Sequence, residues 1–128
     1  METINIKATA TTPAIKFDPK QGTLEIKGRS ISENDTAFYK PVLDNIEQYA
    51  AKPNDLTKVD FMLEYISTAS SKSILAILKF LEAIQHKGNK VTINWYYEED
   101  DEDMRQAGED FQTIVNLPFT MQQVQVEE

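Results

Sequence analysis

Four hydroxyl side chains and one lysine stand close together in the middle of the chain, and their types and spacing suit two kinds of chemistry. The segment runs Glu64-Tyr-Ile-Ser-Thr-Ala-Ser-Ser-Lys72, and its hydroxyl residues are Ser67, Thr68, Ser70 and Ser71. A hydroxyl oxygen at a helix start can accept a free backbone amide of the first turn and so cap the helix. A hydroxyl there can also carry a phosphate, because a helix N-terminus and a nearby cation such as Lys72 both favour negative charge.

The hydroxyl segment lies between a predicted strand and a predicted helix. Before it, residues 59–65 alternate between apolar and mainly polar types, which predicts a strand with Tyr65 on its apolar face. After it, apolar residues recur at helical spacing over 71–87, and Gly88 suits the position just past a helix end. Residues 91–97 alternate again. A strand, a helix and a strand form a crossover unit, so we expect the two strands to be parallel.

The residues near the start of the chain predict a hairpin. Residues 14–17 and 23–27 alternate on either side of a segment that contains proline and glycine, and Gly28 is expected to end the second strand. The weakly patterned residues 3–12 predict either an edge strand or an ordered arm.

A long helix is predicted next, within residues 30–51, where apolar residues recur at helical spacing. Asn34 or Asp35 can cap its start. Pro41 cannot donate a backbone amide, so the helix either begins near Lys40 or bends at the proline.

The last third of the chain predicts one more helix and one more strand. Six acidic residues at 98–103 precede a helical pattern over 104–115, and residues 119–126 follow as a strand. Residues 1–128 are therefore expected to form a single α/β domain with a mixed sheet and helices mainly on one face.

Composition excludes several classes of function. The chain of 128 residues has no cysteine and a formal net charge of −8, which argues against thiolate sites, nucleic-acid binding and anionic membranes. No apolar run approaches the ~20 residues of a membrane-spanning helix. The first residues show no secretory signal pattern, so we expect a cytoplasmic protein.

Catalytic and metal-binding patterns are weak. The only histidine, His86, is predicted at the end of a helix, without a partner arrangement for nucleophilic catalysis. Asp60 and Glu64 share a strand face but lack the burial that would separate their pKa values. The acidic run 98–103 lacks the glycine of a calcium-binding loop. We therefore expect neither an enzyme nor a bound cofactor or metal.

Several short motifs occur in a fixed order along the chain. They are Thr12-Pro-Ala-Ile15, Gly28-x-Ser30-x-x-Glu33-Asn34, Phe38-x-x-Pro41, Tyr65-x-x-Thr68-x-Ser70-x-Lys72, Trp95-x-Tyr97, Asp101-Glu102 and Gly108-Glu-Asp-Phe111. Each motif alone is common, but the ordered set is specific. With this set, residues 12–119 resemble the SiaC family of bacterial regulatory phosphoproteins.

The resemblance implies a non-enzymatic switch with a fold similar to the STAS-type anti-sigma-factor antagonists. A GHKL-type serine/threonine kinase would phosphorylate the family's threonine, which falls on Thr68, and a PP2C-type phosphatase would remove the phosphate. The dephosphorylated form would bind an effector such as a diguanylate cyclase. Ser67 stands where the family commonly has asparagine, and Ala69 where it commonly has serine, so Ser67 and Ser70 are alternative acceptors.

The remaining expectations concern the surroundings of Thr68. Ser70, Ser71 and Lys72 are expected to support the phosphate or the turn. Four residues are candidates for partner binding: Glu33, Asn34, Tyr65 and Tyr96. The alternative function is a constitutive protein-interaction scaffold, in which the hydroxyl groups serve only as a helix cap, at Ser70 or Ser71.

Overall fold

The strands stand in the sheet in the same order as in the chain. The computed structural model describes residues 3–32 and 34–125, and within them six strands form one sheet in the order β1-β2-β3-β4-β5-β6. The elements are β1 (Ile4–Ile6), β2 (Ala14–Asp18), β3 (Thr23–Ser30), α1 (Asp35–Ala51), β4 (Leu56–Ile66), α2 (Thr68–His86), β5 (Lys90–Glu98), α3 (Glu102–Ile114) and β6 (Phe119–Val124).

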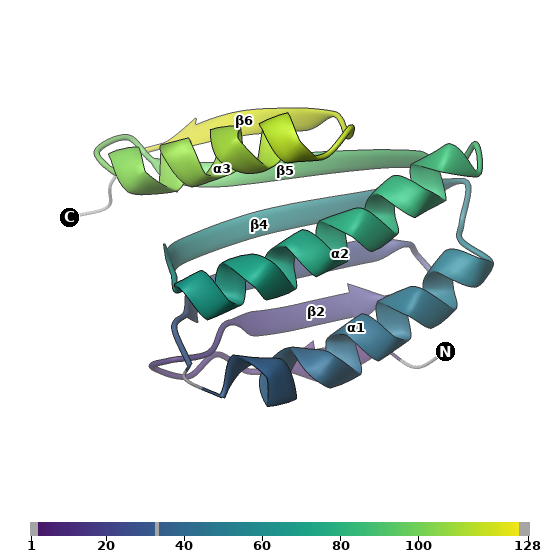
Figure 1. The fold of residues 1–128 in the computed structure, drawn as a ribbon, viewed down its shortest axis with the longest axis horizontal. Helices are drawn as coiled ribbons and strands as arrows, with labels where there is room; N and C mark the ends of the chain where they lie inside the picture. The colour runs from purple at the N-terminus through teal and green to yellow at the C-terminus, as the bar shows by residue number, and fades with distance from the viewer. Residues whose placement is uncertain (1–2, 33, 126–128) are drawn as a thin grey trace.

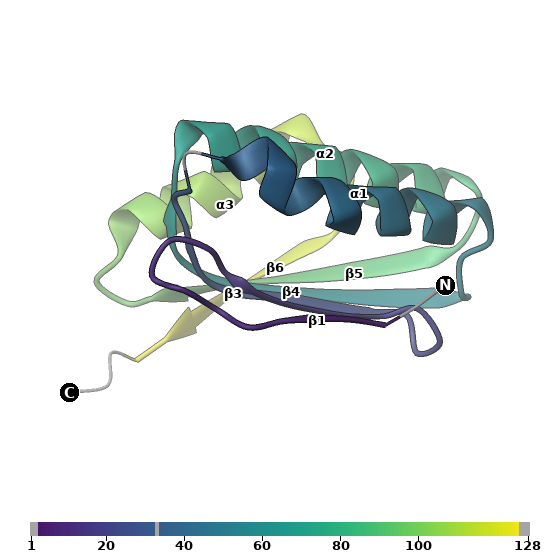
Figure 2. The same ribbon diagram turned by 90° about the horizontal axis from the view of Figure 1, so that it is seen from below.

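The sheet is mixed. Strands β1, β2 and β3 pair in antiparallel fashion, whereas β3, β4, β5 and β6 pair in parallel. Each parallel pair is joined by one helix, and all three helices lie on the same face of the sheet (Figures 1 and 2). Seen from the side, no described segment covers the opposite face (Figure 2). This arrangement confirms the predicted α/β class with helices on one face.

The helix layer and the sheet enclose one hydrophobic core. Its largest fully buried side chains are aromatic and include Trp95, Tyr39, Tyr49, Phe17 and Phe61. The Trp95 side chain joins the sheet to the helix layer, because its indole N–H donates a 3.0 Å hydrogen bond to the Met104 carbonyl of α3. Among the described residues, no helix is long and apolar enough to cross a bilayer.

Boundaries of β3 and α2 differ from the sequence-based expectation, whereas α1 starts where Asn34 or Asp35 was expected to cap it. Gly28 does not end β3, which continues to Ser30 through an irregularity in the pairing with β4. Helix α1 begins at Asp35 and contains Pro41 in its interior. Buried side chains on both sides of the proline hold the helix against the core, and this burial outweighs the one hydrogen bond that proline cannot make. Helix α2 begins at Thr68, three residues before the expected start.

Candidate functional site

The turn between β4 and α2 presents Thr68 at the surface. Ser67 is the N-cap of α2, and its hydroxyl oxygen accepts a 3.1 Å hydrogen bond from the Ser70 amide. Thr68 is the first residue of the helix and is exposed. Among the hydrogen bonds of residues 3–32 and 34–125, none involves the Thr68 hydroxyl. The cap is therefore Ser67, not Ser70 or Ser71 as expected, and the Thr68 hydroxyl is left available.

The residues that follow Thr68 differ in their exposure. Lys72 is exposed and stands four residues after Thr68, so the two side chains share one side of the helix surface. Ser71 is half-buried, and its amide donates to the Ser67 carbonyl. Ser70 is completely buried. A kinase cannot reach the Ser70 hydroxyl in this fold, which removes the support for Ser70 as an alternative acceptor.

Ser70 instead belongs to a buried chain of hydrogen bonds that joins α1, β3 and α2. The Ser30 hydroxyl donates to Ser70 Oγ at 2.7 Å, and the Ser70 hydroxyl donates to Asp35 Oδ1 at 2.5 Å. The Ser73 hydroxyl donates to the other carboxylate oxygen of Asp35. The Tyr39 hydroxyl lies 2.7 Å from Ser30 Oγ. Since each hydroxyl has only one hydrogen and Ser30 uses its own toward Ser70, Tyr39 is the donor in this contact.

Tyr39 is a fully buried member of this chain. Burial raises the pKa of Tyr39 to about 12, and the Asp35 carboxylate adds to the rise, while the Ser30 contact opposes it. The phenol therefore stays protonated over the physiological range and keeps its role as donor. The hydrogen bonds then all point one way, from Tyr39 toward the carboxylate.

Tyr65 is exposed, although the alternation of β4 predicts it on the buried face. Glu64 has no partner in the register between β3 and β4, because Gly28 pairs with Leu63 and Arg29 pairs with Tyr65. Such a bulge turns the following side chains to the other side of the sheet. Gly28 has a φ of 119°, a backbone conformation that favours glycine. As a result Tyr65 is 56% exposed.

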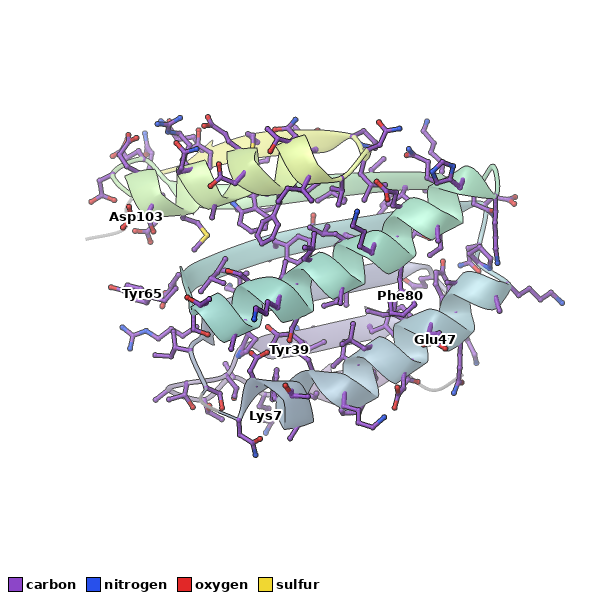
Figure 3. All side chains as sticks on the ribbon, in the orientation of Figure 1. Lys7, Tyr39, Glu47, Tyr65, Phe80 and Asp103 are labelled. Carbon is purple, nitrogen blue, oxygen red and sulfur yellow. The ribbon has the colours of Figure 1, made fainter. Side chains whose placement is uncertain are left out.

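Arg29 holds the exposed tyrosine in place. Its guanidinium lies 5.0 Å from the centre of the Tyr65 ring, within the range of a cation–π contact. The same guanidinium lies 3.6 Å from a Glu64 carboxylate oxygen. Figure 3 shows Tyr65 at the end of β4, beside the start of α2, where its side chain extends outward from the ribbon. Sequence reasoning missed Arg29, and the available signal was an isolated glycine within a strand pattern, which is typical of a bulge.

A groove of about 520 Å³ runs beside Tyr65. Tyr96, Met62 and Arg29 line it together with Tyr65. Tyr96, one of the four candidates for partner binding, is half-buried in the wall of this groove. The groove, Tyr65 and Thr68 all lie near the carboxyl ends of the parallel strands, where α/β sheets commonly bind ligands.

Of the two other predicted partner-binding residues, Asn34 lies at the start of α1. Asn34 is exposed at the N-cap position, but its side chain does not cap the helix. Glu33 lies outside the described residues. Asn34 directly precedes Asp35, so the buried hydrogen-bond chain connects this segment to the first turn of α2.

The other residues considered for catalysis or metal binding are exposed or make contacts within the fold. His86 is exposed in the last turn of α2. Asp60 accepts a 3.0 Å hydrogen bond from the side-chain amide of Asn94, and Glu64 forms an ion pair with Arg29. From the acidic run, Asp101 caps α3 by accepting from the Met104 amide. Within the described part of the chain, no three His, Cys, Asp or Glu side chains are grouped so that they could hold a metal ion.

Comparison with known proteins places this geometry in a family. Residues 6–124 match the family described as "SiaC family regulatory phosphoprotein". The chain belongs to the SiaC family. That description is of a regulatory protein rather than an enzyme, in agreement with the sequence-based expectation.

Solved structures of SiaC have the same fold. Apo-SiaC from Pseudomonas aeruginosa is 31% identical and superposes with a TM-score of 0.87, covering 95% of this chain and 99% of that one. A chain of the complex between the diguanylate cyclase SiaD and its activator SiaC from the same organism is 30% identical, with a TM-score of 0.88 and coverage of 94% and 99%. A further relative, a protein of P. aeruginosa strain UCBPP-PA14 without an assigned function, is 31% identical over 95% of this chain and 97% of its own length.

Proposed function

We propose that this SiaC-family chain is a cytoplasmic switch whose binding to a diguanylate cyclase is controlled by phosphorylation of Thr68. A GHKL-type kinase adds the phosphate and a PP2C-type phosphatase removes it. The dephosphorylated form binds the effector. The complex of the related SiaC with the cyclase SiaD supports the choice of effector.

The observation that carries the proposal is the state of the Thr68 hydroxyl. It is exposed at the first position of α2, whereas Ser67 already accepts a hydrogen bond and Ser70 is buried. A phosphate at this position meets the positive end of the helix dipole, and Lys72 follows one turn later. The fold therefore tolerates the phosphate without rearrangement.

The effect on binding follows from the charge of the phosphate. A phosphothreonine carries about −1.5 to −2 charges, and a partner packed against the turn would have to desolvate them. Tyr65, three residues before Thr68 and fixed by Arg29, supplies an exposed aromatic side chain for that partner. A coupling of ~3 kcal/mol between phosphorylation and binding changes the affinity more than a hundredfold.

The proposal is tested with Thr68→Ala and Thr68→Glu proteins and a diguanylate cyclase from the same organism as this chain. Thr68→Ala should bind the cyclase as the wild type does and should take up no phosphate from the kinase and ATP, as measured by intact mass. Thr68→Glu should bind at least about tenfold more weakly, because a carboxylate reproduces part of the charge. Equal binding by the two variants would contradict the switch and favour a constitutive scaffold.

Ser67→Ala and Ser71→Ala serve as controls for the choice of acceptor. Both should still take up one phosphate. Ser67→Ala should in addition lower the free energy of unfolding by ~1 kcal/mol, because α2 loses its cap. Loss of phosphorylation in Ser67→Ala alone would move the acceptor to Ser67.

A further inference from the structure

Asp35 is a buried carboxylate that the proposed phosphorylation does not use. It is 4% exposed, and no ion pair among the described residues includes it. Hydroxyl groups of α2 satisfy both of its oxygens: Ser70 donates to one and Ser73 to the other. The carboxylate itself stands in the first turn of α1, where the helix dipole favours a negative charge.

Stability alone does not explain such an arrangement. Burying a carboxylate costs free energy that hydrogen bonds only partly offset, and apolar residues of similar size often stabilise a core equally well. A polar chain that is fully satisfied does, however, fix one relative position of the elements it joins. Here the chain joins the start of α1, the end of β3 and the first turn of α2.

The elements it joins are those that present the candidate partner-binding residues. Ser70 is buried and Ser73 is half-buried at the start of α2, where Thr68 is exposed. Asn34 is exposed immediately before Asp35, and the Ser67 amide donates to the Ser30 carbonyl. Asp35 therefore connects two exposed segments that are distant in sequence.

We propose that Asp35 is a positioning residue for the switch: its carboxylate fixes the first turn of α2 against the start of α1, so that Thr68 and Asn34 form one pre-organised docking surface. The proposal rests on the proposed function. Pre-organisation increases affinity because the partner does not have to order these segments on binding. Loss of the carboxylate should therefore loosen both segments together and weaken effector binding, while the sheet stays folded.

The test compares Asp35→Asn with Asp44→Asn. Asparagine keeps the shape of Asp35 but offers one acceptor oxygen, so one of the two serines faces an N–H donor instead. Asp44 is an exposed residue of the same helix, paired with Lys40, so its replacement removes the same charge without touching the buried chain. Hydrogen exchange and affinity for the diguanylate cyclase are measured on both proteins beside the wild type.

In Asp35→Asn, amides of residues 35–39 and 68–73 should exchange about tenfold faster, and the cyclase should bind about tenfold more weakly, as expected for a lost hydrogen bond to a charged group. Amides in the middle of β4 should follow only the global stability. Asp44→Asn should match the wild type in both measurements. Exchange that accelerates uniformly along the chain, or binding by Asp35→Asn equal to that of Asp44→Asn, would overturn the positioning role.

A second variant keeps the proposal testable if Asp35→Asn folds poorly. Ser73→Ala removes one donor from the edge of the chain and leaves the carboxylate with Ser70. It should produce a smaller change of the same kind in the same two segments, and no change there would count against the proposal. If the wild-type chain itself fails to bind the cyclase, the proposed function fails, and the exchange data still decide whether Asp35 couples the two segments.

Discussion

The hydroxyl groups around the β4–α2 turn differ in what they already bind. Ser67 accepts the Ser70 amide, Ser70 and Ser73 donate to Asp35, and the Thr68 hydroxyl faces solvent. Their residue types are nearly the same, so composition could not separate them. Their positions in the first turn separate them, because successive residues of a helix face different directions.

The same buried chain has a consequence at alkaline pH. The pKa of Tyr39 is raised to about 12 in the folded protein, from its ordinary value of 10.0. The unfolded chain therefore loses this proton at a lower pH than the folded one, so the folded state is favoured below pH 10 and this advantage is lost as the pH rises from about 10 to about 12. Two pKa units correspond to roughly 2 to 3 kcal/mol.

Tyr39→Phe should remove this part of the pH dependence. Denaturant unfolding at pH 8, 10 and 11 measures it: the wild type should lose more of its unfolding free energy over this range than the variant does. Tyr39→Phe should be less stable than the wild type at pH 8, because Ser30 loses a donor. If the unfolding free energies of the two proteins fell in parallel as the pH rises, the Tyr39 phenol would not contribute to the pH dependence.

At the scale of elements, α3 is fixed to the sheet by a close contact between a helix glycine and an indole. A Cβ atom placed on Gly108 would lie 2.5 Å from Trp95 Cδ1 and 2.6 Å from Nε1. Trp95 is completely buried, and its N–H is held by the Met104 carbonyl, so the ring cannot move aside. The glycine permits the approach that places α3 on β5.

Gly108→Ala should therefore destabilise the protein, although alanine favours helix by about 1 kcal/mol over glycine. Overpacking costs typically 1–3 kcal/mol, so we expect a net loss of up to about 2 kcal/mol in denaturant unfolding and an altered Trp95 emission spectrum. Gln106→Ala, at an exposed position of the same helix, should leave both unchanged. A more stable Gly108→Ala protein would show that α3 can shift away from the indole.

The elements differ in how far the sequence predicted them. Periodicity identified the hairpin, the parallel strands and the three helices, because each of them has one face against the core and its apolar residues recur at the spacing of that face. It failed where a local feature interrupts the period. The bulge at Gly28 and Arg29 exposes Tyr65, and the Ser67 cap starts α2 three residues early.

The candidate site was predicted only in part for the same reason. Thr68 and Lys72 occur where the sequence suggested, since both depend on one strand–helix junction. The contact of Arg29 with Tyr65 and those of Asp35 with Ser70 and Ser73 join residues 35 or more positions apart. No local pattern records such pairs, and Asp35 was expected only as a helix cap.

At the scale of the whole molecule, one face of the sheet carries no helix layer. Its exposed side chains in the middle of the sheet are largely charged, as at Lys58 of β4 and Lys90 of β5. Leu56, which pairs with Lys90, is also exposed there. Charged residues on an open sheet face oppose association with other copies.

Replacement of both lysines by valine should therefore change association more than stability. The melting temperature should stay within about 5 °C of the wild type, because surface substitutions seldom exceed ~0.5 kcal/mol each. Light scattering after size exclusion should give a larger mass than the wild type at the same concentration. Replacement of both lysines by glutamine removes the same charges but keeps the face polar, so this protein should keep the mass of the wild type. Equal masses for all three proteins would show that the lysines are not needed to prevent association.

The agreement between chain order and sheet order has a consequence for synthesis on the ribosome. Each strand pairs with the strand made just before it, so every newly released strand finds its neighbour already present. Strands β1 to β4 with α1 and α2 contain Thr68, Asp35, Tyr65 and Arg29. The turn that carries Thr68 can thus assemble before α3 and β6 have left the exit tunnel, and the nascent chain then already contains every one of these candidate site residues, whereas Tyr96 of β5 follows later.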